Sequence, residues 1–245
     1  MAQVINTNVG ALFAGAALNK SANALQTAQS RLSSGLRINS AKDDATGLQI
    51  ATGYDSQIRG TNMAIRNSND GISLLQTNDG NLAQVTENLQ RIREIAVQSG
   101  GTIPTGTANG GAETDALILE NTRLTGLATP PADVVNASDG TKYAITSAGV
   151  TSATTYADVD AIDADIAAVT TERANIGADM VSLGSAVSAL QTQSVNISAS
   201  FSRVMDTDYA AEAANMTRNN ILQQAGTAVL SQANQTPNTV LGLLR

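Results

Sequence analysis

Between residues 159 and 201, apolar side chains recur at alternating intervals of three and four positions. This spacing lines them up on one side of an α-helix and is typical of a coiled-coil seam. About 43 residues at about 1.5 Å each predict a helix of roughly 65 Å, longer than a compact domain of this chain accommodates. The stripe comprises Val159, Ile162, Ile166, Val169, Arg173, Ile176, Met180, Leu183, Val187, Leu190, Ser194, Ile197 and Phe201. We therefore expect an elongated helical chain that works by assembling with others.

Two positions of this stripe, Arg173 and Ser194, are polar. A polar residue in a seam either fixes the register of neighbouring helices or marks a place where the helix face turns to solvent. For both residues we favour the solvent-facing interpretation.

The same periodicity predicts further helices over residues 3–34, 44–98, 113–128 and 204–235. In the first of these, apolar residues fall seven positions apart, at Val4, Ala11, Leu18, Leu25 and Leu32. Gly35 ends this helix, a glycine-rich loop spans 99–111, and Pro237 is expected to end the last helix. Residues 40–43 resemble a capping box ahead of the second helix.

Residues 129–156 are the part of the chain with β character. Pro130 and Pro131 end the preceding helix, and Asp139-Gly140 is a hairpin turn signal. Residues 134–135 and 143–145 could pair on either side of that turn. The predicted fold is therefore mainly α: an elongated antiparallel coiled coil or helical bundle with a small β-hairpin tip.

The chain of 245 residues contains no His and no Cys. This composition excludes Ser-His-Asp and Cys-His nucleophiles, metals bound by His or thiolate, and disulfides. Aromatic residues make up 2% of the chain, so few rings are available to line a ligand pocket. We predict no catalytic residue, no metal and no cofactor, and we do not expect an enzyme.

Two acidic groups have alternative interpretations. Residues 158–165 carry four aspartates, but a calcium loop needs Gly sixth and Glu twelfth, where Asp163 and Val169 stand. Asp43 and Asp44 are adjacent, and adjacent side chains on a helix diverge, which argues against a catalytic pair. Acidic residues stabilising a helix N-terminus are the preferred explanation for both groups.

Both ends of the chain lack charge, over residues 1–19 and 219–244. Asn, Gln, Ser and Thr occupy helix faces that carry Lys and Glu in solvated helices, which indicates helices surrounded by other helices. A single arm buries too little apolar surface to offset the entropy of ordering it. We therefore expect the arms to become ordered among copies of themselves.

The remaining charge and hydropathy patterns narrow location and partners. The first nineteen residues have neither the basic start nor the unbroken apolar run of a signal peptide, and no stretch of eighteen apolar residues occurs. We expect no cleaved signal peptide and no membrane span. A net charge of −7 disfavours nucleic acids and anionic membranes as partners.

Several strings resemble bacterial flagellin, the subunit of the flagellar filament. They are residues 1–8 (MAQVINTN), 31–45 (RLSSGLRINSAKDDA), 69–73 (NDGIS), 89–98 (LQRIREIAVQ), 221–226 (ILQQAG) and 229–234 (VLSQAN). The likeness covers about residues 1–98 and 160–245 and implies a structural protein that polymerises for motility.

The resemblance also implies a division of the chain. Residues 1–43 and 202–245 would form the inner-tube domain, 44–128 and 157–201 the helical outer-tube domain, and 129–156 a short tip. The larger outer domains of many flagellins have no room here. The filament interface would include Val4, Ile5, Leu12, Leu18, Leu25, Leu32, Leu222, Val229, Leu230, Val240, Leu241 and Leu244.

The resemblance implies partners as well. These are other copies of the chain, the flagellar cap, junction proteins and an export chaperone, with export through the flagellar secretion system to the extracellular filament. In some flagellins the string matching residues 90–98 is read by a Toll-like receptor. Gln90, Arg91, Glu94 and Ile95 match that motif.

Two other functions remain open at this point. A hook–filament junction protein resembles flagellin at both ends, and a secreted coiled-coil adhesin or effector would share the long helices. Polymerisation into long tubes separates flagellin from the first, and disordered ends in the isolated chain separate it from the second.

Overall fold

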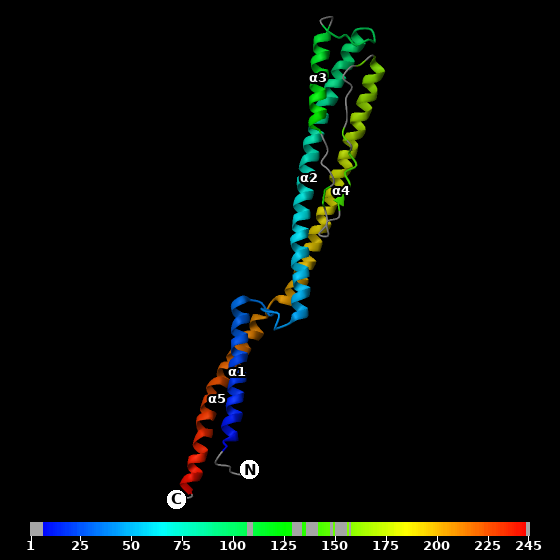
Figure 1. The fold of residues 1–245 in the computed structure, drawn as a ribbon. Helices are drawn as coiled ribbons and strands as arrows, with labels where there is room; N and C mark the ends of the chain where they lie inside the picture. Colours follow the sequence, from blue (N-terminus) through cyan, green and yellow to red (C-terminus); the bar gives the residue numbers. More distant parts are fainter. Residues whose placement is uncertain are drawn as a thin grey trace. The chain divides into compact units, whose positions relative to one another are not determined.

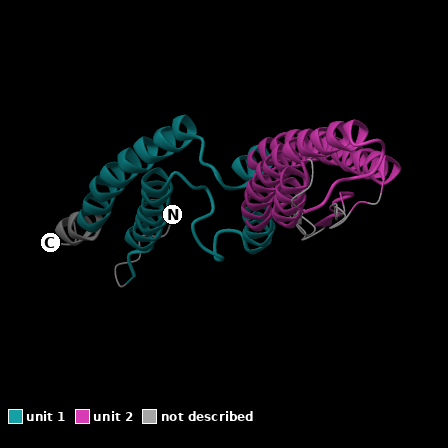
Figure 2. Cartoon of the chain, turned by 90° about the horizontal axis from the view of Figure 1, so that it is seen from above, with its two compact units in different colours: residues 1–55, 199–245 teal, residues 56–198 magenta. Residues whose placement is uncertain are grey.

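A computed structural model describes residues 7–106, 110–128, 134–135, 142–147, 149, 156 and 158–243, with backbone alone for 134–135 and 236–243. The chain divides into two compact units (Figure 2). Unit 1 holds residues 1–55 and 199–245, and unit 2 holds residues 56–198.

The mainly α fold is confirmed. In chain order the elements are α1 (Val9–Ser34), α2 (Ala45–Gln98), α3 (Gly111–Leu127), β1 (Val134–Val135), β2 (Lys142–Tyr143), α4 (Val159–Met205) and α5 (Tyr209–Leu243). The 54 residues of α2 correspond to a helix of roughly 80 Å. Within the described residues the first helix starts at Val9, later than the predicted residue 3, because Asn8 leaves helical geometry and caps it.

In unit 1, α1 and α5 lie side by side and run in opposite directions (Figure 1). The face of α1 that is fully buried carries Ala14, Ser21 and Ala28, which are seven residues apart. The predicted leucine stripe at Leu18, Leu25 and Leu32 stays half-buried. Small residues therefore form the closest contact of this pair, and the larger apolar side chains are displaced to its edges.

The break between α4 and α5 falls at residues 206–208, slightly later than predicted. There Arg37 donates hydrogen bonds to the last carbonyls of α4. Its backbone N–H donates to the Met205 carbonyl at 2.6 Å, and its Nη2 donates to the Val204 carbonyl at 2.7 Å. Gly35, at φ +72°, ends α1 and accepts a bond from the Thr207 N–H at 3.0 Å. These contacts link the turn that follows α1 to the turn between α4 and α5.

The predicted capping box at residues 40–43 is wrong, because α2 begins only at Ala45. The Asp43 carboxylate closes a turn before α2, since it accepts bonds from the Asn39 N–H and from the Ser40 N–H and hydroxyl. The helix itself is capped by Asp44, whose Oδ1 accepts from the Gly47 N–H at 2.8 Å. Asp44 thus stabilises the helix N-terminus as expected, whereas Asp43 has a different structural role, in the turn before the helix.

The predicted stop at Pro237 is wrong, because α5 continues through it to Leu243. Proline has no backbone N–H and normally interrupts the hydrogen-bond ladder of a helix. The side chain of Asn8 donates a hydrogen bond to the Ala233 carbonyl, which the proline leaves without its usual donor, as described below.

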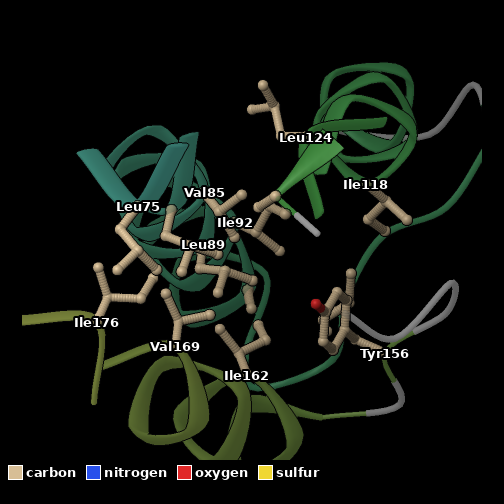
Figure 3. Close-up of a cluster of buried hydrophobic side chains, with 14 of the residues drawn as sticks. Leu75, Val85, Leu89, Ile92, Ile118, Leu124, Tyr156, Ile162, Val169 and Ile176 are labelled. Atoms are coloured by element: carbon tan, nitrogen blue, oxygen red, sulfur yellow. The ribbon is translucent and has the colours of Figure 1, made fainter. Parts of the chain in front are cut away.

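The core of unit 2 joins α2, α3 and α4 (Figure 3). Its centre is completely buried and aliphatic, with Leu75, Leu82, Leu89, Ile92, Ile162, Val169, Ile176 and Leu183 among its members. The apolar members of the predicted stripe on α4 up to Leu190 are all buried or half-buried. This confirms the helix and the face that the periodicity assigned to it.

Arg173 corrects the solvent-facing interpretation of its position. Its Nε donates to Oδ1 of Asp79 on α2 at 2.7 Å. A second ion pair of this kind links Arg93 on α2 to Asp163 on α4 at 2.6 Å. The partner of the later residue on α2 is the earlier residue on α4. Both ion pairs therefore show that the two helices run antiparallel.

The predicted β pairing is confirmed for residues 134–135 and Tyr143: Val134 lies opposite Tyr143 and Val135 opposite Lys142. The second strand is Lys142–Tyr143, so the predicted bounds of 143–145 are wrong. The turn at Asp139-Gly140 lies outside the described residues.

The chain that follows β2 is attached to α4 by acidic residues spaced seven apart, Asp165, Glu172 and Asp179. Asp179 accepts bonds from the N–H groups of Thr146 and Ser147 and from the Tyr143 hydroxyl.

Further along the same face of α4, Glu172 accepts from the Gly149 N–H at 2.8 Å and Asp165 from the Tyr156 hydroxyl at 2.7 Å. We call Asp165, Glu172 and Asp179 the acidic ladder. These bonds hold Tyr143, Thr146, Ser147, Gly149 and Tyr156 of the predicted tip against α4.

Candidate assembly surface

An apolar groove runs between α1 and α5 in unit 1, with a volume of about 550 Å³. Its walls come from Gly10, Phe13, Ala14, Ala17, Leu18, Lys20, Ser21 and Ala24 on α1, and from Asn219, Leu222, Ala225, Gly226 and Val229 on α5. Of these lining residues Lys20 alone is charged. The groove exists because small residues bring the helices together while larger apolar side chains stand along its rim.

Large apolar side chains on this pair reach solvent. Phe13 is 78% exposed, Leu12 66% and Val229 55%. Isolated exposed apolar residues are ordinary on soluble proteins, but a continuous uncharged patch indicates a surface that another protein covers. The arrangement has no obvious chemistry other than packing.

The predicted interface residues fall into three groups. Leu12, Leu222 and Val229 are exposed, whereas Leu18, Leu25, Leu32 and Leu230 are half-buried. Val4, Ile5 and Leu244 lie outside the described residues, and for Val240 and Leu241 only the backbone is described. The interface itself stays a prediction, because a single chain does not show what covers it.

Sequence reasoning missed Phe13, the most exposed large apolar residue of the pair. It lies outside the seven-residue repeat, and the repeat was the criterion for selection. One of two phenylalanines in the chain, placed in an uncharged arm, was the signal that could have found it.

Of the four residues of the receptor-like string, Gln90, Arg91 and Glu94 lie at the surface of α2. Ile95 is only 5% exposed and belongs to the buried interior, so the four do not form one patch. Sequence likeness alone could not separate them, because the helix turns Ile95 toward Gly110 while its neighbours face outward.

Arg91 links this string to α3. Its Nε donates to Oε1 of Glu113 at 2.7 Å, and its Nη1 donates to Oε2 of Glu94 at 3.1 Å. The hydrogen bond from Arg91 holds the pKa of Glu113 below its ordinary 4.5. Arg91 therefore connects the outward face of α2 to the start of α3 through exposed ion pairs.

Other kinds of site were sought in the same residues. In the part of the chain that the structure describes, no three acidic side chains gather closely enough to hold a metal ion. Within that part no helix is both long and apolar enough to cross a membrane.

Comparison with known proteins gives matches on both sides of the β segment. A family model of the bacterial flagellin N-terminal helical region matches residues 5–126. A second model, of the bacterial flagellin C-terminal helical region, matches residues 159–244. The unmatched residues between them include β1, β2 and the segment held by Glu172 and Asp179.

Relatives match over their full length. The chain is 36% identical to a flagellin of Xenorhabdus nematophila over 318 aligned positions, covering 100% of both chains. It is 34% identical to a flagellin of Bacillus subtilis (strain 168) over 302 positions, covering 98% of this chain and 99% of the relative. Its 245 residues are fewer than either alignment's positions, so this chain is a short form.

Proposed function

Because this chain belongs to the bacterial flagellin family, we propose that the groove and rim of the α1–α5 pair are the surface by which its subunits pack together. The protein is a structural subunit that polymerises into the flagellar filament. Its function is to pack against other copies of the same chain, and we assign no catalysed reaction to it.

The observation that carries this assignment is the apolar groove between α1 and α5, in which Lys20 is the one charged lining residue. A filament needs two different surfaces of one subunit that fit each other, so that the array stays open. Exposed Phe13, Leu12 and Val229 supply apolar area that a neighbouring subunit removes from water.

We assign the inner tube of the filament to residues 1–43 and 202–245 and the outer tube to 44–128 and 157–201. The compact units, 1–55 with 199–245 and 56–198, support a division close to these bounds. The placement of 129–156 as the outer tip rests on the family resemblance.

Truncation tests the assignment. Chains lacking 1–35 or 205–245 are expected to stay soluble and partly helical, because unit 2 has its own buried core, and to form no filaments by electron microscopy after seeding. Filaments from either truncated chain would contradict the proposal.

A point variant sharpens this test. Phe13→Asp introduces a charge into the proposed contact and is expected to slow seeded elongation at least about tenfold. Leu119→Asp is the matched control, since Leu119 is similarly exposed, at 73%, but lies on α3. Equal loss in both variants would argue against a special role for the α1–α5 surface.

Neither alternative function is favoured, since the matched relatives are flagellins. A junction protein would not propagate long tubes from seeds. An adhesin or effector would not need two uncharged arms.

The finer partners remain part of the proposal. A cap, junction proteins, an export chaperone, and export without a cleaved signal peptide to the extracellular filament are supported by the family alone. For a Toll-like receptor, the exposed Gln90, Arg91 and Glu94 support a contact, whereas the buried Ile95 would act only by shaping α2.

A further inference from the structure

The path of α5 through Pro237 creates a specific deficit. In an α-helix each carbonyl accepts from the N–H four residues later, so the Ala233 carbonyl should accept from residue 237. Residue 237 is a proline without an N–H, and yet the helix runs on to Leu243. Some other donor has to satisfy the Ala233 carbonyl for these last turns to be stable.

The donor is the side chain of Asn8. Its Nδ2 donates to the Ala233 carbonyl at 2.8 Å, across 225 residues of sequence. At the same time its Oδ1 accepts from the Ala11 N–H at 3.1 Å and caps the start of α1. One amide group thus begins one helix and completes another.

We propose that Asn8 is a positioning residue for assembly: it supplies the hydrogen bond that Pro237 removes, and so fixes the last turns of α5 against the first turn of α1. This inference rests on the proposed function, since the residues it positions belong to the predicted inner tube. It assigns to Asn8 and Pro237 a joint role that neither has alone.

Aspartate and serine can each replace asparagine in only one of the two contacts that Asn8 makes. Aspartate or serine caps a helix as well as asparagine does. Neither replaces the second contact, because aspartate has no donor and serine is too short to place a separate donor on Ala233. Asn8→Ser therefore keeps the cap and removes the bridge, and Pro237→Ala returns an N–H to the helix.

A double-mutant cycle on the full-length chain tests the proposal. The critical concentration for elongation from wild-type filament seeds is measured for the wild type, Asn8→Ser, Pro237→Ala and the double variant. Asn8→Ser is expected to raise it about tenfold, because a partly buried carbonyl loses its donor. Pro237→Ala and the double variant are expected to stay within about threefold of the wild type.

Rescue by Pro237→Ala is the decisive readout. If Asn8 acted by a route other than its bond to the Ala233 carbonyl, Asn8→Ser would lose as much in the Pro237→Ala background as in the wild type, and such equal losses would overturn the proposal. An unchanged critical concentration in Asn8→Ser would do so too, while leaving the proposed function standing. Wild-type chains that form no filaments would overturn both, so the two failures are distinguishable.

Discussion

Arg91 bonds two carboxylates from different parts of unit 2, Glu94 on its own helix and Glu113 at the start of α3. Exposed ion pairs contribute little to stability on average. Their clearest trace is in titration, because a hydrogen bond to the charged form of a carboxyl lowers its pKa. Glu120 is bonded in the same way by Arg123, which provides a second, independent pair.

We predict that Arg91→Gln raises the pKa of Glu113 toward its ordinary value, because the hydrogen bond that lowers it is lost. A carboxyl whose pKa is lower in the folded chain stabilises it above the unfolded pKa, and this contribution is lost as the pH falls through the lowered value. Carboxyl NMR titration of both chains measures the shift. Arg123→Gln is the control, and is expected to raise the pKa of Glu120 while leaving Glu113 unchanged.

At the scale of elements, the acidic ladder explains how a segment with little regular structure is held. Asp179 is 1% exposed and accepts bonds from two backbone N–H groups and a tyrosine hydroxyl. Removing a buried acceptor leaves its donors unsatisfied, which costs more than the net contribution of an ordinary hydrogen bond.

Asp179→Ala is predicted to lower the free energy of unfolding of unit 2 by about 1–3 kcal/mol and to expose residues 142–149 to proteases. Urea unfolding and limited proteolysis measure the two effects. Asp163→Ala is the matched control on the same helix: Asp163 is about half exposed in its pair with Arg93, so a loss of about 0–1 kcal/mol is expected. Equal losses would contradict the role given to the ladder.

The helices and the buried face of α4 could be predicted from the sequence. Burial of one helix face imposes a regular repeat of apolar residues, and one or two polar exceptions do not obscure it. Helix ends could not. Pro237 signals a stop unless the bond from Asn8 to the Ala233 carbonyl is known, and that bond joins residues 225 positions apart. Charge depletion predicted arms covered by other helices, but it did not predict the groove between them. The exposure of Phe13 and the inward turn of Ile95 depend on side-chain direction, which likeness to a family does not give.

At the scale of the whole molecule, the two units differ in how much they can stabilise themselves. Unit 2 has a core of fully buried Leu, Ile and Val. In α1 the fully buried residues are Ala14, Ser21 and Ala28, which bury little apolar area against the entropy of ordering the arm. Under the proposed function, the missing contacts come from neighbouring subunits in the filament.

Hydrogen exchange is therefore predicted to separate the units. In dilute, unpolymerised chains the amides of α1 and α5 should exchange fast, while those of α2, α3 and α4 within unit 2 should be protected. In filaments both sets should be protected. Slow exchange of α1 and α5 in the dilute chain would contradict the proposed dependence on neighbours.

The acidic ladder has one more consequence. Asp179 accepts bonds from the backbone N–H groups of Thr146 and Ser147, which every residue except proline possesses. The exposed side chain of Thr146 can accordingly be exchanged for a charged, bulky or sugar-bearing one without unseating the segment.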